Sequence, residues 1–267
     1  MRFCVPCFPG ANGGDMGKLY GGAAWVGVLL LLAFWAVCAW ALGQPVLLPS
    51  PWSVLLRWFS DLSESGFWVA IAHTALEAFL GALLGAAVAL PLAYVVYRSR
   101  FLSAAFGPIL AVSQSVPAVA LAPLLVIWVG YGVFAISLLC ALIVFFPILI
   151  TTVLGLRGLP VEVLEAARLD GAGGWSLLRF VEAPMALPSV LAGFRAGFTL
   201  SVTGAVVGEY VMGGRGLGAR LSLQSAAADM PGLFSSVLTL CALAALIYGL
   251  LSRVERSSRA LRVSGRD

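Results

Sequence analysis

Residues Val133–Leu154 read VFAISLLCALIVFFPILITTVL and contain no charged side chain. A helix rises about 1.5 Å per residue, so about 20 apolar residues cross the roughly 30 Å hydrocarbon core of a bilayer. The stretch is long enough, and it predicts a transmembrane helix. The preceding Gly130-Tyr131-Gly132 predicts a tight turn, so another helix should end directly before it.

The rest of the chain has the same apolar character, since its 267 residues are 61% hydrophobic and 10% charged. A soluble domain carries about 25% charge. Five further apolar runs predict, with the first, an all-α polytopic membrane protein of about six transmembrane helices. The membrane domain should cover 22–255, between an unstructured tail at 1–21 and a short tail at 256–267. The five runs are Gly22–Leu42, Val69–Tyr97, Gly107–Val129, Leu187–Val207 and Leu233–Leu251.

The 16 Lys and Arg residues are divided unequally between the two sides that six spans define. Twelve lie in the tails and in the loops after the second and fourth spans, three lie on the other side, and Arg195 falls inside a span. Positively charged loops stay in the cytoplasm. The asymmetry therefore places both termini in the cytoplasm, in a multi-pass protein of the inner or plasma membrane. Because the Arg residues form no single patch, no nucleic-acid partner is expected.

Few residues are available for metal or catalytic chemistry. Cys4 and Cys7 form a lone C-x-x-C, but a zinc site of this kind needs a second pair or histidines, and the chain has one histidine. The sequence contains no P-loop, no H-E-x-x-H and no G-x-S-x-G. We therefore expect no metal or cofactor in this chain. A membrane-embedded enzyme stays the weaker alternative, and an ion-driven secondary transporter is another, although no inverted repeat is visible.

The loop between the fourth and fifth spans is the most informative one. Residues 160–172 read PVEVLEAARLDGA. Pro160 suits a helix start, Glu162 favours the positive end of the helix dipole, and Gly171 supplies a helix stop. A second helical piece is expected at Trp175–Glu182. The loop should thus be a helical hairpin with apolar side chains on its exposed face, either lying on the membrane surface or binding a partner protein.

This loop resembles the signature loop of ABC importer permeases, in which Glu-Ala-Ala is followed at fixed spacings by Gly and by Ile-x-Leu-Pro. Glu165-Ala166-Ala167, Gly171 and Pro184 occupy those positions, with Val181 in place of Ile and Ala183 in place of Leu. The resemblance implies a coupling helix that docks in a cleft of a separate ATPase subunit. The implied contact residues are Glu165, Ala166, Ala167, Leu169, Gly171 and Ala172.

Other segments extend the resemblance over most of the chain. Leu48-Pro49-Ser50-Pro51, Val116–Leu124 and Phe145–Ile148 are similar to the nitrate, sulfonate and taurine branch, and the branch is similar to permeases for thiamine-type pyrimidine precursors. The resemblance implies a type I ABC importer-like fold and a homodimer in membrane lipid. It also implies two ATPase subunits that bind ATP and Mg, an extracytoplasmic solute-binding protein, and a small polar solute as cargo.

Polar residues within the spans are the candidates for a translocation path, because such residues are costly in a membrane. His73 and Glu77 share a helix face and could pair, or could reach water near the outer end of their span. Arg195 could form an internal pair or extend toward the cytoplasm. For the ionisable residues a structural role is the preferred interpretation and a role in the path is the alternative. The candidates are His73, Glu77, Gln114, Arg195, Thr199 and Glu209.

Two outer segments complete the sequence-based description. Trp52, Leu55 and Phe59 lie at helical spacing after Pro51 and predict an amphipathic helix at the outer membrane interface. The segment Glu209–Gly232 is rich in glycine and predicts turns at the outer surface.

Overall fold

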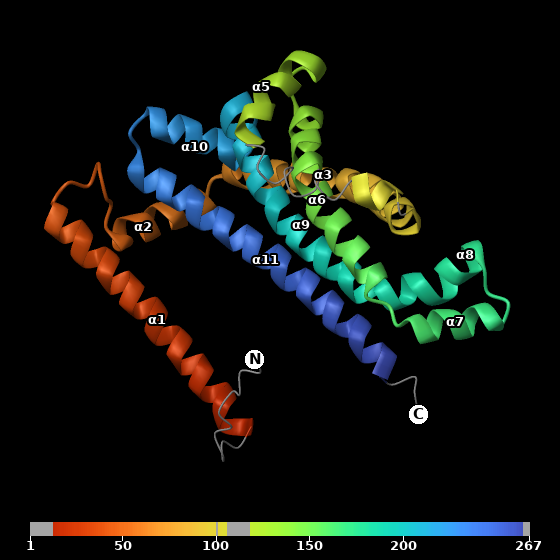
Figure 1. The fold of residues 1–267 in the computed structure, drawn as a ribbon. Coiled ribbons are helices and arrows are strands. Elements are labelled where there is room, and N and C mark those ends of the chain that lie inside the picture. The colour runs from red at the N-terminus through yellow and green to blue at the C-terminus, as the bar shows by residue number, and fades with distance from the viewer. Residues whose placement is uncertain (1–12, 100, 106–117, 264–267) are drawn as a thin grey trace.

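The computed structural model describes residues 13–99, 101–105 and 118–263, which form helices joined by short turns (Figure 1). The predicted all-α fold class is confirmed. In chain order the elements are α1 Gly13–Leu42, α2 Pro51–Leu62, α3 Ser65–Arg98, α5 Ala118–Val129, α6 Val133–Arg157, α7 Val161–Leu169, α8 Gly174–Leu177, the π-helical turn η1 Leu178–Glu182, α9 Ala183–Met212, α10 Leu217–Ala226 and α11 Met230–Val263.

Four helices in the described part of the chain are long and apolar enough to cross a membrane, and they confirm four of the predicted runs. They are Ser65–Arg98, Val133–Arg157, Gly174–Met212 and Met230–Arg253. The two other predicted runs coincide with α1, which begins at Gly13, and with α5. The first part of the run Gly107–Val129 lies outside the described residues, and so does Gln114.

The centre of the bundle consists of α3, α6 and α9, which pack against one another through small residues. A side chain at Gly85 of α3 would lie 2.8 Å from the carbonyl oxygen of Ala141 in α6. One at Gly197 of α9 would lie 2.8 Å from a methyl carbon of Val144, also in α6. Glycine therefore lets the helices approach more closely than larger residues would, as is common between membrane helices.

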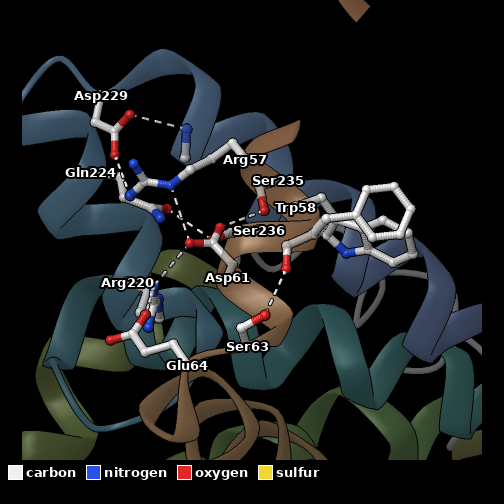
Figure 2. A network of polar contacts seen from close by, with 12 residues as sticks. Arg57, Trp58, Asp61, Ser63, Glu64, Arg220, Gln224, Asp229, Ser235 and Ser236 are labelled. Carbon is white, nitrogen blue, oxygen red and sulfur yellow. Dashed lines mark hydrogen bonds and ion pairs between the residues drawn. The ribbon is translucent and has the colours of Figure 1, made fainter. Parts of the chain in front are cut away.

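A polar network joins α2 to α10 and α11 at one end of the bundle (Figure 2). Asp61 of α2 is 4% exposed, and its carboxylate lies 3.1 Å from Arg57 Nε and 3.7 Å from Arg220 Nη2 of α10. Ser235 of α11 donates a hydrogen bond of 2.6 Å to the second oxygen. Arg57 also lies 3.0 Å from Asp229. Because the buried carboxylate is paired with two guanidinium groups, the network fixes α2 onto the bundle.

The helix α2 is amphipathic, as predicted. Ser50 accepts a hydrogen bond of 3.2 Å from the backbone N–H of Ser53, and Pro51 occupies the first turn, a combination that favours a helix start. Trp52 and Phe59 are exposed, whereas Val54 is buried. Its place at a membrane interface stays a prediction.

The helix α1 lies at the periphery of the bundle (Figure 1). Its described side chains are largely exposed, including Leu29, Leu30 and Leu31. Toward its C-terminal end, Trp35 stacks on Phe234 of α11 with ring centroids 5.6 Å apart.

Candidate functional site

The predicted helical hairpin is present, and a glycine turn defines its shape. The N–H of Gly171 donates to the Arg168 carbonyl (3.1 Å), and the N–H of Ala172 donates to the Ala167 carbonyl (2.9 Å). Gly171 has φ +89°. These two bonds and the left-handed glycine form a Schellman motif, which ends α7 and reverses the chain toward α8. The glycine stop inferred from the sequence is therefore confirmed.

One face of the hairpin packs onto the bundle and the other is exposed. Leu164 of α7 and Leu177 of α8 are buried against Leu156, at the end of α6, and Ala186, in the first turns of α9. Leu169, by contrast, is 89% exposed. Figure 1 shows the hairpin at the end of the bundle opposite to α2 and α10.

The predicted coupling residues lie on this hairpin with different exposure. Ala167 and Ala172 are half-buried against the apolar side chains between the hairpin and the bundle. The other four, namely Glu165, Ala166, Leu169 and Gly171, are exposed. Trp175 and Phe180 add exposed aromatic side chains on the second half of the hairpin, and the sequence analysis did not single them out as contact residues.

The sequence analysis also missed a buried acid where the hairpin meets α9. Glu182, the last residue of the π-helical turn η1, is fully buried. The Tyr97 hydroxyl donates a hydrogen bond of 3.3 Å to Glu182 Oε1, and Arg98 Nη1 lies 3.9 Å from the same oxygen. The only signal in the sequence is a carboxyl group between apolar residues, two positions before Pro184.

Two further buried acids lie at the opposite end of the bundle. Glu209 of α9 is fully buried, and it accepts hydrogen bonds from Thr74 Oγ1 of α3 (2.8 Å) and from the backbone N–H of Gly218 (2.6 Å). Thr74 in turn accepts from the N–H of Leu217 (2.8 Å). The Glu209 carboxylate and the Thr74 hydroxyl thus each accept one of the free N–H groups at the positive end of α10.

This contact explains why the segment Glu209–Gly232 does not consist of turns alone. Leu217–Ala226 forms the helix α10, which follows the glycine turn at Gly213–Gly216. The prediction of turns was wrong for α10, because its first turn is stabilised by a residue of another helix. No pattern of neighbouring residues in the sequence predicts such a contact.

Glu77 corrects a second expectation. It was expected near the outer end of its span, either reaching water or paired with His73. The structure buries it to 2% exposure and places its carboxyl group against Glu209. Its Oε2 has no hydrogen-bond partner in the described part of the chain. His73 is half-buried one turn away.

A cavity of about 410 Å³ lies between the ends of α3, α6 and α9, and Glu77, but not Glu209, lines it. Its lining includes His73, Glu77, Tyr131, Gly213 and Arg215. Ligand pockets for small molecules typically measure about 300–1,000 Å³ and combine apolar walls with a few polar groups. The cavity therefore has the size of a small-molecule site, with mostly apolar walls and a few polar groups.

The remaining path candidates lie elsewhere. The guanidinium group of Arg195 lies 5.2 Å from the ring centroid of Tyr248, so it contributes to the contact between α9 and α11. Thr199 donates a hydrogen bond of 3.0 Å to the Arg195 carbonyl within α9. The structure therefore brings together His73, Glu77 and Glu209, but not Arg195 and Thr199.

No group of three or more metal-ligating His, Cys, Asp or Glu side chains occurs within the described ranges.

Comparison with known proteins agrees with this architecture. The riboflavin transport system permease protein RibX of Chloroflexus aurantiacus is 42% identical, over 86% of this chain and 87% of its own length. The formylaminopyrimidine transport permease protein ThiX of Halalkalibacterium halodurans is 33% identical, over 85% and 90%. An inward-facing structure of the MetNI methionine ABC transporter shares the fold, with a TM-score of 0.66 and 21% identity over 72% of this chain and 95% of that one. Residues 81–260 match the family described as binding-protein-dependent transport system inner membrane component. The chain therefore belongs to this family, the permease subunits of ABC transporters.

Proposed function

We propose that this permease imports a small nitrogen heterocycle and works as a homodimer with two ATPase subunits and an extracytoplasmic solute-binding protein. The observation that carries the proposal is the hairpin of α7 and α8, which presents apolar side chains at one end of the bundle. ATP and Mg bind to the ATPase subunits. This chain supplies the translocation path and the hairpin that transmits movement of the ATPase to it. Both termini and the hairpin lie on the cytoplasmic side.

The exposed face of the hairpin supports docking to a partner protein. Leu169, Trp175 and Phe180 are each more than 70% exposed. Exposed apolar surface is unfavourable in water. A contact that buries it is stabilised by about 25 cal/mol per Å² of apolar surface. Glu165, Ala166 and the turn at Gly171 adjoin this surface, and small residues let a partner approach the backbone. We therefore assign this face to the ATPase.

The solute class rests on the relatives and on the outer cavity. Two of the relatives are permeases for riboflavin and formylaminopyrimidine, both nitrogen heterocycles. The cavity offers the Tyr131 ring for stacking and the Glu77 side chain as a hydrogen-bonding group. Heterocycles have flat faces and N–H donors that suit such a lining.

A sulfonate is the second candidate solute. The taurine transport system permease protein TauC of Escherichia coli is 29% identical over 71% of this chain. Arg215, which is exposed and lines the same cavity, is the group that would attract an anion.

The test begins with purification of the C-terminally tagged chain from its native host in mild detergent. Co-purification of a P-loop ATPase and a binding protein is the expected result. Uptake into vesicles is then measured with radiolabelled riboflavin, a thiamine-type pyrimidine and taurine, each with and without ATP. ATP-dependent uptake of a heterocycle supports the proposal. Uptake that follows an ion gradient without ATP would overturn it in favour of a secondary transporter.

A further inference from the structure

The hairpin is continuous in the chain with α6 and α9, but not with α3. Gly158–Pro160 joins α6 to α7, and η1 runs directly into α9. The helix α3 carries His73 and Glu77 at the cavity, so it takes part in any change of shape there. It can follow a movement of the hairpin through its packing against α6 and α9 and through its own side-chain contacts with the hairpin.

The polar contacts of the hairpin with α3 meet at Glu182, and Tyr94 and Tyr97 of α3 also pack on the apolar side chains of the hairpin. Glu182 Oε1 accepts from the Tyr97 hydroxyl and lies 3.9 Å from Arg98 Nη1, both in the last turn of α3. Arg98 is itself held, because its Nε donates to the Tyr94 hydroxyl (3.1 Å) and its guanidinium group lies 5.5 Å from the Tyr94 ring centroid. One side chain of the hairpin thus contacts an ordered group of three on α3.

A π-helical turn ends at Glu182 and joins α8 to α9. The N–H of Ala183 donates to the carbonyl of Leu178, five residues earlier, instead of four. Each residue of an α-helix turns by about 100°, so the extra residue rotates α8 relative to Glu182 and α9, which stay in helical register. Pro184 gives a physical reason for the wider turn, because its ring would clash with the preceding turn of a regular helix. Such π turns occur often at functional sites.

Stability alone does not account for a carboxylate at this position. Glu182 Oε2 has no hydrogen-bond partner in the described part of the chain, and the bonds to Oε1 are long. A buried charge that is incompletely paired destabilises a protein relative to an apolar residue of similar size. A contact that changes as the hairpin moves during transport explains the residue better.

We propose that Glu182 is a positioning residue that transmits movement of the hairpin to α3, through Tyr97 and Arg98. Glu77 and Tyr97 lie about 30 Å apart along α3 at 1.5 Å per residue. Pro91 interrupts the hydrogen bonding of α3 between them, but Ala89 and Ala93 are fully buried in the core and support the helix on both sides. A tilt imposed at Tyr97 therefore reaches the outer cavity. This inference rests on the proposed coupling to an ATPase.

The test compares transport with ATP hydrolysis in the same proteoliposomes, which contain the permease, its ATPase and its binding protein. Glu182→Gln keeps the shape and removes the charge, and Tyr97→Phe removes one hydroxyl group. Both variants should retain ATP hydrolysis but take up about fivefold fewer solutes per ATP, the factor that corresponds to one ordinary hydrogen bond. Tyr210→Phe is the matched control, because Tyr210 is 47% exposed and lies outside this contact.

The outcomes separate this inference from the proposed function. If no ATPase accompanies the wild-type chain, the proposed function fails. If the ATPase is present and both variants keep the wild-type ratio of uptake to hydrolysis, the role of Glu182 is refuted. A merely structural contact would lower uptake and hydrolysis in the same proportion, which also refutes it. Where Glu182→Gln reduces the yield of folded protein, Tyr97→Phe decides.

Discussion

Replacing Gly171 by valine is expected to stop uptake while leaving the protein inserted in the membrane. The residue lies in the hairpin and not in a span, so insertion does not depend on it. It holds φ at +89°, and a Cβ placed there would meet no atom within 4 Å. The effect of a side chain is therefore a backbone effect and not a clash.

The size of the effect follows from the turn. A left-handed conformation costs a non-glycine residue about 1–2 kcal/mol, and a β-branched residue more. The Schellman motif also holds two hydrogen bonds, each contributing about 1 kcal/mol. A loss of about 2 kcal/mol reduces the ratio of the correctly turned hairpin to other conformations about 30-fold. Docking of the ATPase would be weakened by up to the same factor.

The assay is a graded series at one position. Asparagine adopts the left-handed conformation more readily than alanine or valine, so uptake should decrease from Gly171→Asn through Gly171→Ala to Gly171→Val. ATP-dependent uptake and the amount of ATPase retained per permease are measured for each variant. Gly173→Val is the matched control, because Gly173 has φ −144°, which valine accepts, and open space around it. Wild-type uptake with Gly171→Val, or equal damage by asparagine and valine, would refute the reasoning.

Three further predictions concern other parts of the chain. Gly216→Ala should lower the melting temperature in detergent by about 5 °C or more, because its Cβ would overlap the buried carboxylate that caps α10, whereas Gly249→Ala, which points into open space, should not. Asp61→Ala should destabilise the protein by about 2 kcal/mol, since it leaves two arginines without their shared partner, and a thermal shift equal to that of Glu64→Ala, an exposed acid, would contradict this. Leu169→Ala should reduce the ATPase recovered with the tagged permease without changing its melting temperature, and unchanged recovery would count against the docking face.

The parts of the fold that could be predicted are those coded by neighbouring residues. Val133–Leu154 is apolar over a full membrane thickness, so its helix follows from length alone. The hairpin follows from the helix-forming residues of α7 and from Gly171. Glycine readily adopts the left-handed conformation that ends a helix. Both features depend on residues within one continuous segment of the chain.

The parts that could not be predicted depend on contacts between distant residues. Glu77 and Glu209 are 132 positions apart in the sequence, and only the packing of α3 against α9 brings their carboxyl groups together. For the same reason α10 was interpreted as a series of turns, because the group that stabilises its first turn is Glu209. The sequence did not predict a role for Glu182 because its partners, Tyr97 and Arg98, belong to α3, which is separated from it in the sequence by α5 and α6.

The peripheral position of α1 has a consequence for how such chains diversify. The family match begins at residue 81, within α3, so it leaves out α1 and α2. The leading helix α1 contributes one aromatic contact and an exposed apolar surface. The hairpin of α7 and α8 and the cavity are built from later segments. A different leading segment can therefore replace α1 in front of the same helical bundle, provided that the ion pair between Arg57 and Asp61 is kept. A chimaera should therefore be cut before Pro51, so that Arg57 and Asp61 stay with the bundle.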